Sequence, residues 1–109
     1  MNDKPPNVSP NELALRKAAF DKAMAVYFNV WNMECPNCAY WLQEGLLEIP
    51  GVLLVDVFYK QGIAVVIYDP VRVTTDALRR GVKQIGTDKS HFYGAEVVGQ
   101  SSAHEALRL

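Results

Sequence analysis

The chain has 109 residues, the size of one ordinary domain. Half of its residues are hydrophobic, and 11 Lys and Arg against 12 Asp and Glu give a net charge of -1, a balance that argues against a nucleic-acid partner because phosphates attract a surplus of cations. No apolar run approaches the roughly 20 residues that span a bilayer, and the polar, Pro-rich start is no signal peptide, so we expect a cytoplasmic protein that is not membrane-embedded.

Residues 1–8 predict a flexible lead, and residues 9–24 predict an extra N-terminal helix. Ser9 is a good N-cap, Pro10 suits the first helical position, and Glu12 closes a capping box. The side chains that follow at helical spacing are Leu13, Arg16, Lys17, Phe20 and Met24.

Residues 25–98 predict one domain of alternating strands and helices, and residues 99–109 predict an unordered tail. The expected order is strand 25–31, helix 36–49, strand 52–59, strand 63–68, helix 74–85, with Thr74 or Thr75 as its cap, a polar loop at 87–92, and strand 93–98. This order is typical of an α+β, ferredoxin-like βαββαβ sandwich, in which two helices cover one face of a four-stranded antiparallel sheet.

Alternation along the strands assigns their side chains to the two faces of the sheet. The helix-covered face is expected to hold Val26, Phe28, Val30, Val55, Val57, Val66 and Tyr68. The opposite face is expected to present Tyr27, Trp31, Phe58, Val65 and Ile67. That face is too apolar to remain exposed to solvent. Either the N-terminal helix covers it, through Leu13, Phe20 and Met24, or a second copy of the chain covers it in a homodimer.

Two cysteines, Cys35 and Cys38, stand three residues apart on a loop that enters a helix. The positive end of the helix favours thiolate over thiol, and thiolates are soft ligands for Cu(I) or Zn(II). A structural zinc takes about four protein ligands, so two cysteines indicate transient binding. The same spacing also serves thiol–disulfide exchange, with Cys35 as nucleophile and Cys38 as resolving thiol. Neither Pro50 nor Pro70 stands where a thioredoxin-type domain has its later proline.

The surroundings of the cysteines carry a more specific pattern. The motif is Met33-x-Cys35-x-x-Cys38, and the positions that accompany it are Leu42, Leu46, Ile49, Gly51, Val52, Val55, Val57, Val66, Tyr68, Asp69 and Pro70. From about Ala25 to Val98 the chain resembles the heavy-metal-associated domain of copper chaperones, mercury-binding proteins and metal-transporting ATPases. The resemblance implies a surface metal site at Cys35 and Cys38, with Met33 folded inward beneath the loop.

The chain departs from the family pattern at two places. Asn32 stands where a glycine is usual, and asparagine tolerates positive φ. The Gly-Tyr pair expected after the second helix is split between Gly86 and Tyr93, with a longer loop between them. In the family, this loop lies beside the metal.

Three residues are candidates for supporting the metal pair: Met33, Glu34 and His91. Glu34 is either a hard carboxylate ligand that favours Zn(II) or Cd(II), or a solvent-exposed loop side chain without a role in metal binding. Three interpretations of His91 stay open: a third ligand, a side chain that screens the negative charge of the bis-thiolate complex, or an ordinary loop histidine. Lys89 is the other residue that could screen this charge. No role is expected for His104. Tyr40 and Trp41 lie outside the expected core. They could form a docking surface or a contact with the extra helix, or they could simply be partly packed.

The expected function is therefore non-enzymatic: the chain holds Cu(I) between two thiolates and passes it on by ligand exchange, in metal transport or detoxification. The resemblance implies a metal-transporting membrane ATPase or a metal-responsive regulator as partner. Two alternatives stay open, the same site used for Zn(II), Cd(II) or Hg(II), and a dithiol oxidoreductase.

Overall fold

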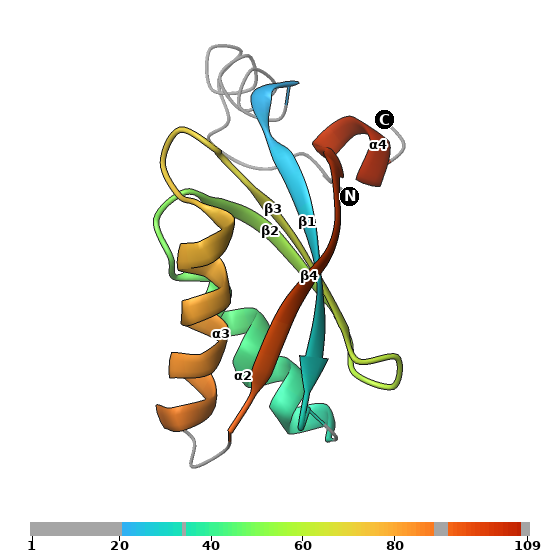
Figure 1. Cartoon of the computed structure of the whole chain (residues 1–109), viewed down its shortest axis with the longest axis vertical. Helices are drawn as coiled ribbons and strands as arrows, with labels where there is room; N and C mark the ends of the chain where they lie inside the picture. The colour runs from blue at the N-terminus through green and yellow to red at the C-terminus, as the bar shows by residue number, and fades with distance from the viewer. Residues whose placement is uncertain (1–20, 34, 89–91, 108–109) are drawn as a thin grey trace, which may run out of the picture.

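The computed structural model describes residues 21–33, 35–88 and 92–107. Its elements are β1 (Met24–Trp31), α2 (Pro36–Leu47), β2 (Val52–Phe58), β3 (Ile63–Tyr68), α3 (Thr75–Asp88), β4 (Gly94–Ser102) and α4 (Ala103–Leu107). The strands form one antiparallel sheet in the order β2-β3-β1-β4. Helices α2 and α3 lie side by side on one face of it (Figure 1), so the predicted ferredoxin-like sandwich is confirmed.

The main core lies between the sheet and these two helices. Alternate residues of β1 enter it, so Val26 and Phe28 are fully buried and Val30 nearly so. Leu42 and Leu46 of α2 and Leu78 and Val82 of α3 meet them from the helix side. The predicted assignment of side chains to the helix-covered face is confirmed.

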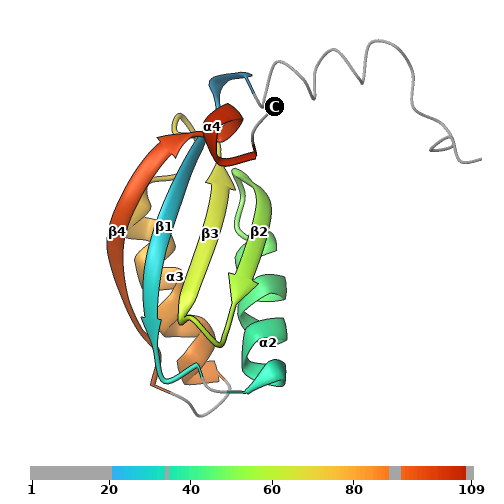
Figure 2. The same ribbon diagram turned by 90° about the vertical axis from the view of Figure 1, so that its right-hand side faces the viewer.

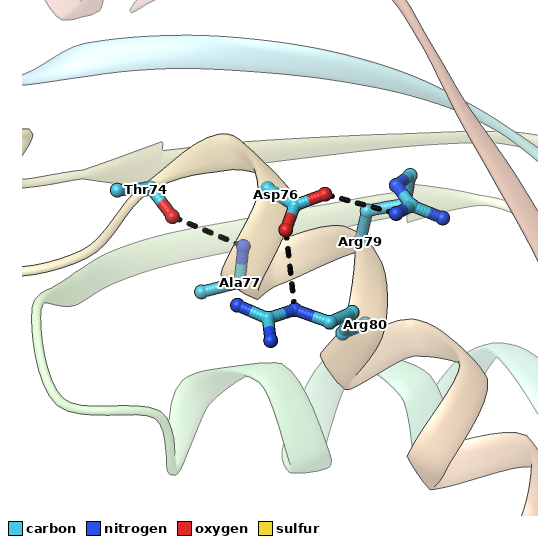
Figure 3. Close-up of polar contacts among 5 residues, drawn as sticks. All are labelled: Thr74, Asp76, Ala77, Arg79 and Arg80. Atoms are coloured by element: carbon cyan, nitrogen blue, oxygen red, sulfur yellow. Dashed lines mark hydrogen bonds and ion pairs between the residues drawn. The ribbon is translucent and has the colours of Figure 1, made fainter.

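The first turn of α3 is stabilised by side chains that the sequence places at its start (Figure 3). The hydroxyl of Thr74 accepts a hydrogen bond of 3.1 Å from the backbone N–H of Ala77, so Thr74 is the cap. Asp76 pairs with Arg79 at 2.9 Å and with Arg80 at 3.2 Å. The hydrogen bond from Arg79, assisted by the charge of both arginines, lowers the pKa of the Asp76 carboxyl.

The C-terminal residues differ from the predicted unordered tail. β4 continues to Ser102 and pairs with the start of β1, and Ala103 then begins α4, whose first N–H donates to the carbonyl of Ala23 at 3.0 Å. The predicted strand stopped at Val98 because the register of β1 with β4 shifts between Tyr27 and Phe28, which breaks the alternation on which the prediction depended.

Smaller differences concern where helices end. α2 ends at Leu47 rather than at Ile49, and α3 runs to Asp88, so Thr87 is helical rather than part of the predicted loop. Met24 begins β1 and does not belong to the predicted helix over residues 9–24, of which residues 9–20 lie outside the described residues. Within the described part of the chain, no helix is long and apolar enough to cross a membrane.

Candidate functional site

Cys35 lies between β1 and α2, and Cys38 lies in the first turn of α2. Cys35 is the N-cap of α2, with extended φ and ψ of -130° and 156°, and its sulfur accepts the backbone N–H of Cys38 at 3.0 Å. Pro36 takes the first helical turn, where a missing N–H costs nothing. This geometry brings the Cα atoms of Cys35 and Cys38 to 5.1 Å, and the two sulfurs form a disulfide.

The disulfide is the oxidised form of the pair that the sequence predicts as free thiolates. Its two sulfurs cannot act as anionic ligands, so a metal would bind only after two electrons and two protons convert the bond into two thiols. Helix α2 fixes the backbone of both cysteines: Cys38 lies in its first turn, and the N–H of Ala39 donates to the carbonyl of Cys35 at 3.2 Å. The pairing of the two sulfurs therefore rests on local backbone geometry.

The two sulfurs differ in exposure. Cys38 is only 2% exposed and belongs to the main core cluster, whereas Cys35 is half-buried at its edge. Met33 is also 2% exposed in this cluster, so it is folded inward beneath the loop as expected. Solvent and partners therefore reach the pair from the Cys35 side.

Asn32 gives the loop its bend. Its φ is 67°, the left-handed region that asparagine tolerates better than most residues. Its side-chain amide also donates to the carbonyl of Phe92 at 2.8 Å. The residue that departs from the family pattern therefore adopts a backbone conformation that glycine also adopts easily, and it adds a hydrogen bond to the segment before β4.

Gly86 and Tyr93, which a longer loop separates in the sequence, are in contact in the structure. A Cβ on Gly86 would lie 2.8 Å from Cγ of Tyr93, so the ring packs directly on the glycine. Tyr93 is 2% exposed in the same core cluster as Met33 and Cys38, and burial raises the pKa of its hydroxyl. The longer loop thus leaves Tyr93 in the core that supports the cysteines.

The other predicted site residues divide into two groups. Glu34, Lys89 and His91 lie outside the described residues, and within those residues no group of three or more His, Cys, Asp and Glu side chains could hold a metal. His104, for which no role was expected, pairs with Asp21 at 2.6 Å. Helix α4, which contains His104, lies at the opposite end of the sheet from the start of α2 (Figure 2).

Sequence reasoning missed a groove of about 670 Å³ between α2 and α3. Glycines let the two helices approach closely, since a Cβ on Gly45 would meet Ile85 at 2.6 Å. The groove begins at Tyr40, which is 62% exposed, and at half-buried Trp41, and it has an acidic rim. The rim residues are Glu44, Glu48 and Asp88. Because these acidic residues come from two helices, no local sequence motif predicts that they line one groove.

Comparison with known proteins places this geometry in a family. Residues 27–88 match the heavy-metal-associated domain. The copper-exporting P-type ATPase of Bacillus subtilis (strain 168) is 30% identical in an alignment of 88 residues that covers 77% of this chain and 11% of the ATPase. A copper binding domain from HMA7, a P-type ATPase, aligns with a TM-score of 0.65 at 22% identity, over 72% of this chain and 97% of the domain. CopZ metallochaperone aligns with a TM-score of 0.58 at 25% identity, over 66% and 98%.

Proposed function

Because the chain belongs to the heavy-metal-associated domain family, we propose that it binds Cu(I) between the thiolates of Cys35 and Cys38 and passes the ion on by ligand exchange. The observation that carries the proposal is the placing of both cysteines at the start of α2, with their Cα atoms 5.1 Å apart. Copper is favoured because the relatives described above include a copper-exporting ATPase and a copper binding domain.

The start of α2 supplies the electrostatics that thiolate binding needs. The N–H of Cys38 points at the Cys35 sulfur at 3.0 Å, and a hydrogen bond to a charged acceptor is stronger than one to a neutral acceptor. The partial positive charge of the helix N-terminus adds to it. Both effects stabilise the pair of anions after reduction and partly offset the negative charge of a bis-thiolate Cu(I) complex.

Transfer requires no change of oxidation state. A thiolate of the partner bonds to two-coordinate Cu(I), giving a three-coordinate ion, and one Cys–Cu bond then breaks and releases its thiolate. A second partner thiolate replaces the remaining cysteine in the same way. Half-buried Cys35 is the accessible ligand, so incoming and departing ions pass on its side, while Cys38 stays in the core. No substrate bond is made or broken apart from bonds to the metal, so the chain acts as a carrier rather than an enzyme.

The partner proposed for this transfer is a metal-transporting membrane ATPase, with a metal-responsive regulator as the second candidate. The chain spans 11% of the length of the ATPase that it resembles. The transfer would take place in the cytoplasm, on the side of the membrane where thiols stay reduced.

The identity of the ion is the finer part of the proposal. A bis-thiolate site alone favours Cu(I), whereas an added carboxylate or imidazole favours Zn(II) or Cd(II). Glu34 and His91 are the residues that would shift the preference, and a bis-thiolate pair without them also suits Hg(II).

Titration of the reduced chain with Cu(I) against a competing chelator tests the proposal. We expect one Cu(I) per chain, and Cys35→Ser should lower the affinity by roughly a hundredfold or more, because one of two soft ligands is lost. Asn37→Ser changes an exposed residue in the first turn of α2, between the two cysteines, without removing sulfur and is the matched control. Tighter binding of Zn(II) than of Cu(I) would overturn the choice of ion. Disulfide turnover at enzymic rates by a chain without tight metal binding would instead establish the oxidoreductase.

A further inference from the structure

The face of the sheet opposite α2 and α3 carries a second, smaller apolar cluster. Ala23, Ala25, Ile67 and Ala103 are buried there, and α4 lies over that end of the face (Figure 2). α4 has only five residues. It therefore covers one end of the face and leaves the rest of the sheet without a cover among the described residues.

The uncovered part forms a shallow hollow of about 230 Å³ next to α4, which we call the open-face patch. It is lined by Tyr27, Leu54, Asp56, Phe58, Val65, Ile67 and Ala106. Leu54 is 40% exposed and Phe58 44% exposed. Single exposed apolar side chains are ordinary, but a contiguous apolar hollow marks a surface that something covers.

The chain enters the described structure beside this patch. The carbonyl of Ala23 accepts the first N–H of α4 at 3.0 Å, and the carboxylate of Asp21 pairs with His104 of α4 at 2.6 Å. Residues 1–20, which lie outside the described residues, are therefore attached at the end of the open face. They need no long linker to reach the patch.

The sequence of that segment complements the patch in chemistry. At helical spacing Leu13 and Phe20 share one face with the cations Arg16 and Lys17. The patch offers apolar side chains around one acid, Asp56, whose carboxylate forms no ion pair with another described residue. Two apolar anchors and two cations thus match an apolar hollow with a negative charge inside it.

The lengths also agree. The strand register places Leu54 beside Ile67, Asp56 beside Val65 and Phe58 beside Ile63. From Leu54 to Phe58 the patch extends four residues along β2, which is about 13 Å. A helix over residues 10–20 would be about 16 Å long. We propose that residues 10–20 dock as a helix on the open-face patch, as an intramolecular cover of the sheet that leaves the cysteine loop free at the far end.

Hydrogen exchange and sedimentation of the full, reduced, metal-free chain test this proposal first. We expect a monomer in which the backbone amides of residues 12–20 exchange at least tenfold more slowly than in an unstructured peptide. Unprotected amides in this segment would overturn the proposal. A sedimenting mass of twice the chain, with the patch protected, would also overturn it, because a second copy would then be the cover.

A matched pair of substitutions tests which face of the segment binds. Leu13→Asp places a charge on the face with Phe20, whereas Leu15→Asp makes the same change about 160° away around the helix. We expect Leu13→Asp to remove the protection of residues 12–20 and to increase the fluorescence of an added apolar dye severalfold, and Leu15→Asp to leave both near wild type. Equal effects of the two variants would overturn the proposed docking face.

Charge reversal supplies an independent measurement that does not depend on apolar packing. Asp56→Lys should weaken protection of residues 12–20, and adding Arg16→Glu with Lys17→Glu should restore it. No effect of Asp56→Lys, or no rescue, would overturn the role of this charge in docking. None of these substitutions touches Cys35 or Cys38, so binding of Cu(I) is expected to stay unchanged, and the proposed function can fail without affecting this result.

Discussion

At the scale of single residues, Asn32 provides the bend between β1 and the cysteine pair. Replacing it with alanine keeps φ at 67°, which costs about 1–2 kcal/mol for a residue other than glycine or asparagine, and removes the 2.8 Å hydrogen bond to Phe92. We expect Asn32→Ala to lower the free energy of unfolding by roughly 1.5–3 kcal/mol, because both contributions are lost. Urea unfolding of the reduced chain measures it.

Asn32→Gly separates the two contributions. Glycine adopts positive φ without strain, so only the exposed hydrogen bond is lost, and we expect a change of no more than about 0.5–1 kcal/mol. If Asn32→Gly were as destabilising as Asn32→Ala, the side-chain bond to Phe92, and not the backbone angle, would be the reason for asparagine at this position.

At the scale of elements, the contact between the end of α3 and the start of β4 depends on Gly86. A methyl group there would lie 2.8 Å from Cγ and 2.9 Å from the backbone nitrogen of Tyr93. Alanine gains up to about 1 kcal/mol of helix propensity, but forced overpacking costs about 1–3 kcal/mol. We expect Gly86→Ala to lower stability by roughly 1–2 kcal/mol in a thermal or urea unfolding measurement.

Gly81 of the same helix is the matched control. A methyl group at this position meets the end of the flexible Ile49 side chain at 2.8 Å and otherwise only Leu46 at 4.0 Å. Gly81→Ala should therefore be neutral or stabilising within about 1 kcal/mol. A loss at Gly81 equal to that at Gly86 would show that backbone contact with Tyr93 is not what distinguishes the two sites.

The elements also show what the sequence could predict. Strands β1 to β3 and helices α2 and α3 follow from alternation, helical spacing and the Thr74 cap, because each signal lies within one element. The end of β4 and α4 did not follow, because small residues such as Gly99 and Ala103 carry no periodic signal. Gly99 is held by pairing with Tyr27 of β1, and Ala103 by a hydrogen bond to Ala23, just before β1.

The same distinction applies to the candidate site. The cysteine pair and inward Met33 are local to one motif and were predicted. The packing of Tyr93 on Gly86, the bond from Asn32 to Phe92 and the acidic groove between α2 and α3 each join residues from separate elements. Contacts of that kind are decided by tertiary packing, so single-sequence patterns do not contain them.

At the scale of the whole molecule, we expect metal binding at the proposed site to be coupled to folding through Cys38. This residue lies in the main core together with Met33 and Tyr93, so we expect an ion held by its thiolate to bind the folded chain more tightly than the unfolded one. Free Cu(I) at about a thousandfold above its dissociation constant should add about 4 kcal/mol of stability. For a domain near this size, that raises the midpoint of thermal unfolding by more than about 10 °C.

The oxidised chain supplies the sharpest control for this coupling. Its disulfide removes both ligands while keeping every other residue, so its midpoint should not move when Cu(I) is added. The reduced Cys35→Ser variant should respond weakly, since a single thiolate remains. If all three forms gained the same thermal stability from Cu(I), the ion would be binding elsewhere on the chain. A gain confined to the reduced wild type requires that the ion bind at the start of α2, where the sheet, the helices and the cysteine pair share one core.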